Sequence, residues 1–242
     1  MEVSLNYVSG IDDAFVSMYF SKHNINPNKE LEIRKVVAKS IDCLGRYVND
    51  SVPEYDKMMK SFCNMVKKHI TIGRFVNISC TVYGLHRAGQ DDWDAHAKRF
   101  DNRIIRNSTR LKVKEEAMQD FSSVSEFYEG KIIPFDQAAK KLGIEIPDKI
   151  EDDGKEYIKT INGYILESEK DNPDVQRGLY MLSIPSDFIF NVNLTEFAHV
   201  YKERGNHGSA NPEVKRCAEE IATQLELFQP TFNRELLMAI QN

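Results

Sequence analysis

The feature that most constrains the fold is the regular succession of elements in the last third of the chain. Residues 188–192 place Phe, Phe and Val at alternate positions, and this period of two predicts a β-strand. Residues 194–205 follow with helical spacing and end at a glycine, a common helix stop. Residues 212–225 form the cleanest amphipathic helical pattern, with proline in the first turn. A strand followed by two such helices is typical of a domain that combines a sheet with helices.

The first part of the chain shows the same combination. Residues 3–7 alternate apolar and polar side chains as in a strand, and residues 12–20 predict a helix. Residues 29–49 and 55–66 predict two amphipathic helices. Residues 70–82 are rich in β-branched types and fit either a strand or a strand followed by a helix.

The predicted class is therefore α+β, in a single domain. Residues 157–166 predict one further helix. Two segments are interpreted as insertions into this domain. One is helical and covers residues 29–68; the other is loop-rich, covers residues 120–153 and contains Pro134 and Pro147.

Composition and charge exclude several classes of protein. Hydrophobic residues make up 41% of the 242 residues, which is enough for a folded core. The longest apolar stretches fall far short of the roughly 20 residues that cross a bilayer, so no membrane span is expected. A net charge of −5 argues against a general nucleic-acid-binding protein. No basic segment leads into an apolar run at the N-terminus, so the expected location is the cytoplasm.

Common catalytic motifs are absent from the sequence. No glycine-rich phosphate loop, H-E-x-x-H pair or G-x-S-x-G elbow occurs, which disfavours dinucleotide-binding, P-loop and common hydrolytic proteins. The cysteines are widely spaced and lack histidines at a ligand interval, so we predict buried free thiols and no metal site. They are Cys43, Cys63, Cys80 and Cys217.

Four arginines recur at helical spacing in the middle of the chain: Arg99, Arg103, Arg106 and Arg110. On a helix they would share one face. Two interpretations remain open. The stripe is either a solvated charged face or a surface that contacts an anion or another subunit.

One series of residues carries a family resemblance. It consists of Asp174–Arg177, Ile184-Pro185, the aromatic strand at 188–190, Asn193, Phe197–Arg204, His207 and Glu213-Val214. In order and spacing this series resembles the C-terminal half of the flavin-dependent thymidylate synthases (ThyX). Upstream, His86-Arg87 and Arg99-Phe100 resemble the start and the close of the family's R-H-R-x-x-S-x-N-E-x-S-x-R-Y signature.

The sequence also departs from the family at defined positions. Leu85 stands where the signature has its first arginine, and its central serine falls on Ala95 or Ala97. Thr195 stands where the family has the arginine of Asn-Ala-Arg. The family's Thr-Pro-x-Glu-His flavin element is not recognisable. The flavin contacts are therefore less well preserved than the nucleotide contacts.

The resemblance implies a ThyX-like fold, with a central mixed or antiparallel sheet flanked by helices. It also implies an enzyme that binds FAD and converts dUMP to dTMP. The one-carbon donor would be methylenetetrahydrofolate, and NADPH would reduce the flavin. The implied dUMP-binding residues are Arg177, Arg204 and Arg99, with Arg204 as the catalytic residue; the implied FAD-binding residues are His86, Arg87, Asn193 and His207. The resemblance also implies a homotetramer whose active sites are shared between subunits.

Other interpretations of these residues stay open. The chain is alternatively a nucleotide-binding relative that has lost catalysis or acts on another pyrimidine nucleotide, and a nucleic-acid-binding module is a weaker third interpretation. Each arginine fits a surface salt bridge, and each histidine fits a structural role. Asn193 also fits a turn or a helix cap.

Overall fold

A computed structural model describes most of the chain in two compact units. The described residues are 1–24, 26–49, 52–96, 102–107, 125–160, 162–172, 175, 177–179 and 182–240. Unit 1 contains Met1, Gly84–Ala88 and Arg106–Asp187, and unit 2 contains Glu2–Tyr83, Gly89–Ile105 and Phe188–Asn242.

A four-stranded sheet carries the apolar strands that the sequence predicts. Its strand order is β1-β2-β7-β3, and β1 pairs antiparallel with β2. The strands are β1 Glu2–Ser9, β2 Asn77–His86, β7 Pro185–Asn193 and β3 Asn102–Arg106. Alternate residues of β7, namely Phe188, Phe190 and Val192, are buried, as the period of two predicts.

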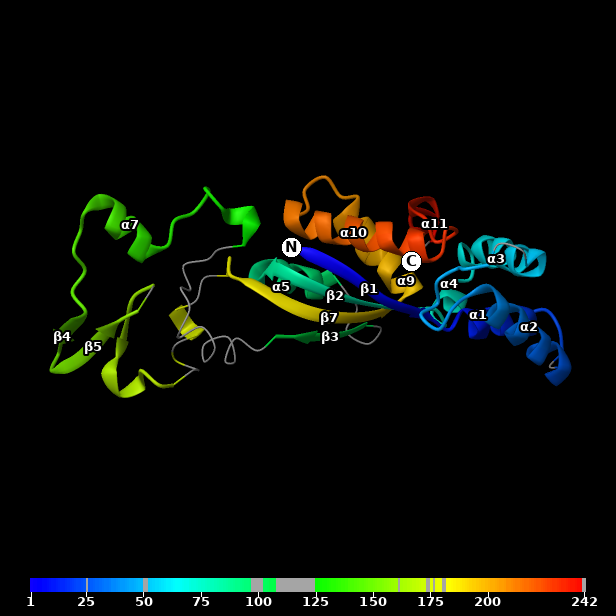
Figure 1. Ribbon diagram of the computed structural model, residues 1–242, viewed down its shortest axis with the longest axis horizontal. Coiled ribbons are helices and arrows are strands. Elements are labelled where there is room, and N and C mark those ends of the chain that lie inside the picture. The colour runs from blue at the N-terminus through cyan, green and yellow to red at the C-terminus, as the bar shows by residue number, and fades with distance from the viewer. Residues whose placement is uncertain are drawn as a thin grey trace. The chain divides into compact units, whose positions relative to one another are not determined.

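The long helix α10, Pro212–Phe228, packs along β1 (Figure 1). The Gln224 side chain fixes this packing, because its Oε1 accepts from the Leu5 backbone N–H at 2.6 Å and its Nε2 donates to the Val3 carbonyl at 2.6 Å. The buried residues of α10 include Val214, Ile221 and Leu225. The predicted amphipathic helix and its buried face are confirmed.

Four N-terminal helices of unit 2 pack against one another. They are α1 Ile11–Phe20, α2 Pro27–Ser40, α3 Pro53–Val66 and α4 Ile70–Gly73. Phe15 contacts Tyr55 and Phe62, with ring centroids 5.7 and 6.1 Å apart, so aromatic packing joins α1 to α3. The predicted helices at 12–20 and 55–66 are confirmed, and the one at 29–49 ends earlier, at Ser40.

The remaining helices of unit 2 follow in chain order. They are α5 Arg87–His96, whose first two residues belong to unit 1, then α9 Leu194–Val200, the π-helical turn η4 Tyr201–Gly205, and α11 Arg234–Ala239. The predicted helix at 194–205 is confirmed as α9 and η4 together. The α+β class, with an antiparallel sheet flanked by helices, is confirmed as well.

Unit 1 contains a separate antiparallel sheet of order β4-β5-β6. Its strands are β4 Lys149–Asp152, β5 Lys155–Lys159 and β6 Tyr164–Leu166, and its helical segments are η1 Glu126–Tyr128, α7 Phe135–Leu142, η2 Glu167–Glu169 and η3 Arg177–Leu179. The predicted helix at 157–166 is wrong. A turn interrupts it, because the Thr160 N–H donates to the Gly163 carbonyl at 2.7 Å.

Two further predictions need correction. Residues 70–82 form a short helix and then a strand, which is the reverse of the order considered. The described part of the segment at 120–153 contains α7 and β4. The arginine stripe is not helical at Arg103 and Arg106, because both residues lie in the strand β3. Arg99 and Arg110 lie outside the described residues.

Whether 29–68 and 120–153 are insertions into one domain stays a prediction. In the part of the chain that the structure describes, no helix combines the length and the apolarity needed to cross a bilayer. The described residues also contain no group of three or more His, Cys, Asp or Glu side chains placed to hold a metal ion.

Candidate functional site

The clearest polar site in unit 2 is an ion pair between Arg204 and Asp92. Arg204 Nη2 lies 3.2 Å from Asp92 Oδ1, and the two side chains are 14% and 33% exposed. Arg204 Nη1 also donates to the Glu203 carbonyl at 3.2 Å. Arg204 Nε is buried and has no hydrogen-bond partner among the described residues. The pair combines a mostly buried cation with a carboxylate that water reaches in part.

The π-helical turn η4 fixes the backbone that carries Arg204. The Asn206 N–H donates to the Tyr201 carbonyl at 3.0 Å, the five-residue spacing of a π-helix. A Cβ at Gly205 would lie 2.6 Å from the buried Tyr201 ring, so this close packing requires glycine. The Tyr201 hydroxyl donates to Glu219 Oε1 on α10 at 3.0 Å, and burial together with that carboxylate raises the pKa of Tyr201. Single π-turns of this kind are frequent at functional sites.

Trp93 anchors the helix that carries Asp92. It lies next to Asp92 on α5, is fully buried, and packs edge-on against Phe190 with ring centroids 5.3 Å apart. Its ring also lies 6.2 Å from that of Phe188 on the same strand. Two rigid elements, α5 held on β7 and η4 held on α10, therefore present the two partners of the ion pair.

Asn193 caps a helix, as one of the open interpretations predicts. Its Oδ1 accepts from the Glu196 backbone N–H at 2.9 Å at the start of α9, and the residue is 7% exposed. Because α9 and η4 form one helical segment, Asn193 and Arg204 lie at opposite ends of it, roughly 15 Å apart at about 1.5 Å per residue. The structure does not bring these two predicted site residues together.

Replacing Asn193 with alanine should lower the free energy of unfolding by about 0.5–2 kcal/mol, because α9 loses its cap. Asn193→Asp keeps an acceptor at the same position and should retain most of that stability. Denaturant titrations of both variants measure the effect, and Asn64→Ala, at an exposed position on α3, serves as the control. Equal stability of Asn193→Ala and wild type would show that the cap contributes nothing.

His207 lies on an exposed loop between η4 and α10. Its Nδ1 accepts from the Ser209 backbone N–H at 3.3 Å and lies 2.9 Å from Ser209 Oγ. In the neutral ring the proton therefore sits on Nε2. His207 presents an N–H donor that suits an oxygen of a ligand.

His86 and Arg87 belong to unit 1. His86 is 1% exposed, and its ring lies 5.0 Å from that of Tyr128, edge-on, and 6.1 Å from that of Phe127. The Arg87 backbone N–H donates to the Ile184 carbonyl at 3.0 Å. Aromatic side chains of η1 thus enclose His86, which favours a structural role for this histidine.

The other predicted residues are placed only in part. Arg177 opens η3, and its side chain lies outside what the structure describes, as does all of Arg99. Leu85 is fully buried at the position of the family's first signature arginine. Thr195 is 3% exposed and donates from Oγ1 to the Ile70 carbonyl at 2.8 Å, so a short polar side chain fills that position.

The prediction of buried free thiols is confirmed for Cys80 and Cys217 and is wrong for Cys43, which is exposed. Burial raises the pKa of Cys63 to about 11 and of Cys80 to about 12. These two thiols stay protonated near neutral pH and are poor nucleophiles.

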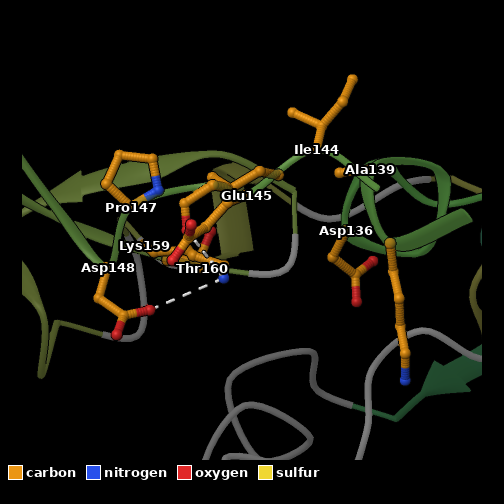
Figure 2. A pocket seen from close by; sticks show the side chains of 10 residues that line it. Asp136, Ala139, Ile144, Glu145, Pro147, Asp148, Lys159 and Thr160 are labelled. Atoms are coloured by element: carbon orange, nitrogen blue, oxygen red, sulfur yellow. Dashed lines mark hydrogen bonds and ion pairs between the residues drawn. The ribbon is translucent and has the colours of Figure 1, made fainter. Parts of the chain in front are cut away.

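A separate hollow of about 850 Å³ lies in unit 1. Figure 2 shows Asp136 and Ala139 of α7 on one side of it and Pro147, Asp148 and Lys159 on the other, with Lys159 Nζ 3.7 Å from Asp148 Oδ1. Carboxylates and ammonium groups both line it. None of the described lining residues is a site residue that the sequence predicts.

Comparisons with known proteins show the fold. The chain is similar to the crystal structure of thymidylate synthase X (ThyX) from Helicobacter pylori with FAD and dUMP, with a TM-score of 0.51 and 10% identity over 98% of this chain and 100% of that chain. A second crystal structure of flavin-dependent ThyX from the same organism, complexed with FAD and dUMP, gives a TM-score of 0.44 and 10% identity, with 96% of this chain and 99% of that chain covered. No family model matches the sequence, and the curated proteins give no match either.

The first likeness shows that the predicted ThyX-like fold is correct. The sequence alone does not identify the partner of Arg204. Asp91, Asp92 and Asp94 form an acidic cluster in the sequence, but only the folded chain shows which of them reaches Arg204.

Proposed function

We propose that the chain is a flavin-dependent thymidylate synthase that converts dUMP to dTMP. The observation that carries this proposal is the likeness to a ThyX crystal structure with FAD and dUMP over nearly the whole length of both chains. The preserved order of Arg177, Asn193, Arg204 and His207 in the sequence supports it. In this proposal methylenetetrahydrofolate supplies the carbon and NADPH supplies the electrons.

Arg204 is the proposed catalytic residue at the uracil end of dUMP. Its guanidinium is held by two contacts on its Nη atoms. A fixed cation beside a carbonyl oxygen stabilises the negative charge that develops there when a base such as uracil becomes an enolate. Arg177 and Arg99 are the proposed phosphate contacts, because the planar guanidinium matches two phosphate oxygens at once.

The residues of unit 2 fit a bound flavin nucleotide better than those of unit 1 do. Asn193 uses its Oδ1 for the helix cap, which leaves its Nδ2 amide to donate to a flavin or ribityl oxygen. His207 presents its Nε2–H on an exposed loop. His86 does not fit a flavin contact in its enclosed position, and the role of Arg87 stays a proposal. When bound, reduced flavin supplies the hydride for the reaction.

The proposal does not use a cysteine nucleophile. The raised pKa values of Cys63 and Cys80 agree with this, because neither thiol supplies a thiolate at neutral pH. The chemistry of the chain's own residues is limited to binding, orientation and charge stabilisation.

The protein is expected to be a homotetramer, since the resemblance implies active sites shared between subunits. Light scattering of the full chain at micromolar concentration measures this state. A monomer under these conditions would remove the shared-site part of the proposal, because residues of one chain alone would then have to hold FAD and dUMP.

The visible absorption spectrum of the purified protein tests the proposal most directly, followed by calorimetric titration with dUMP. Flavin bands and dUMP binding are the expected results. A colourless protein that takes up no FAD and no dUMP would sink the proposal.

A second candidate function is a nucleotide-binding relative without flavin chemistry. The buried Leu85, the buried Thr195 and the enclosed His86 favour it, because each stands at a position where the family resemblance expects a flavin contact. Binding of dUMP without binding of FAD would support this alternative over the enzyme.

A further inference from the structure

We infer that Asp92 is a positioning residue that aims Arg204 at the nucleotide. The inference rests on the proposed function and adds a residue to its site. Its basis is the 3.2 Å contact between Arg204 Nη2 and Asp92 Oδ1, made between two elements that are distant in sequence.

The contacts of Arg204 show why a positioning group matters. An arginine side chain has many rotamers, and it binds tightly only when one of them is selected. Among the described residues, Arg204 has two partners, the Asp92 carboxylate on Nη2 and the Glu203 carbonyl on Nη1. The second is a neighbouring backbone atom and moves with Arg204. Asp92 is therefore the contact that ties the guanidinium to another part of the fold.

Asp92 lies on a helix that is itself firmly held by packing. Trp93, the next residue on α5, is fully buried against Phe188 and Phe190, so the helix is fixed on β7 at this point. On the other side, Gly205 and the buried Tyr201 fix η4 against α10. A functional side chain held between two rigid elements keeps the geometry that a substrate needs.

An alternative is that Asp92 competes with the substrate for the donor groups of Arg204. In that case Asp92 would weaken nucleotide binding. The geometry favours positioning over competition. Asp92 contacts one Nη atom through one oxygen, and each Nη carries a second hydrogen that no described residue accepts. The two interpretations predict opposite signs: loss of Asp92 weakens nucleotide binding in the first and strengthens it in the second.

The test is a set of calorimetric dUMP titrations on the full-length protein. Asp92→Asn removes the charge but keeps the shape, and it should weaken dUMP binding by about 3- to 30-fold. Asp91→Asn is the matched control, because it removes the same charge from an exposed neighbour on the same helix, and it should change affinity by less than about twofold. In an Arg204→Gln background, Asp92→Asn should have no further effect, since a positioning residue acts only through Arg204.

Trp93 is the single tryptophan of the chain, so its emission reports folding beside the mutated residue. If Asp92→Asn does not fold, Asp92→Glu replaces it in the same titrations. Glutamate keeps the charge but moves the carboxylate by one methylene, and a loss of about 2- to 10-fold is then expected.

The outcomes separate the inference from the proposed function. A wild-type protein that does not bind dUMP would sink both. Wild-type binding with equal or tighter binding by the folded Asp92 variant would overturn the inference alone. An equal effect of Asp92→Asn with and without Arg204 would also overturn it, because Asp92 would then act independently of the arginine.

Discussion

Replacing Arg204 with glutamine should weaken dUMP binding by about 30- to 1000-fold. A charge-assisted contact to an arginine contributes more than a neutral hydrogen bond, and the low exposure of Arg204 keeps water from replacing it. Titration calorimetry measures the two affinities. Arg216→Gln, at an exposed position on α10, is the control and should bind as wild type does.

Arg204→Lys separates shape from charge at this position. Lysine keeps the positive charge but loses the planar fork, and its single ammonium cannot contact Asp92, the Glu203 carbonyl and a ligand with the same geometry. We expect an affinity between those of wild type and Arg204→Gln. Wild-type affinity in Arg204→Lys would mean that only the charge matters, and wild-type affinity in Arg204→Gln would remove Arg204 from the nucleotide site.

The sequence predicts the elements whose apolar period is unbroken. Residues 188–192 bury every second side chain, and residues 212–225 bury every third to fourth side chain. The strand β7 and the helix α10 therefore follow from local pattern alone. The segment at 157–166 shows the limit. Its apolar residues fit a helix, but the turn from Thr160 to Gly163 and the pairing of β5 with β6 give it a sheet structure.

The candidate site was predictable in part for a similar reason. The order of residue types along the chain, which a sequence preserves, points to Arg204 and His207. Asp92 lies in a run of acidic residues, and its selection as the partner of Arg204 depends on how α5 and η4 pack. The helix cap joins Asn193 to a backbone N–H only three residues further along the chain. The sequence alone therefore predicts this cap as one of the alternatives.

Trp93→Ala should lower the free energy of unfolding by about 3–5 kcal/mol, the cost of removing a large aromatic side chain from a packed core. Trp93 is fully buried and contacts the rings of Phe188 and Phe190, so the substitution leaves a cavity at the junction of α5 and β7. Denaturant unfolding followed by far-ultraviolet circular dichroism measures the change, because the variant has no tryptophan to report it. Phe75→Ala is the control, since Phe75 is 46% exposed and should cost less than about 1 kcal/mol.

Trp93→Ala also tests whether the packing of the core controls the geometry of the candidate site. A cavity under α5 releases the segment that carries Asp92, and Arg204 then loses the partner that orients it. Trp93→Phe, which keeps an aromatic ring, should lose less stability and retain more dUMP affinity than Trp93→Ala. Calorimetry below the unfolding transition of each variant measures this order. Full dUMP affinity in a destabilised but folded Trp93→Ala protein would show that the packing of α5 does not control the geometry of the arginine.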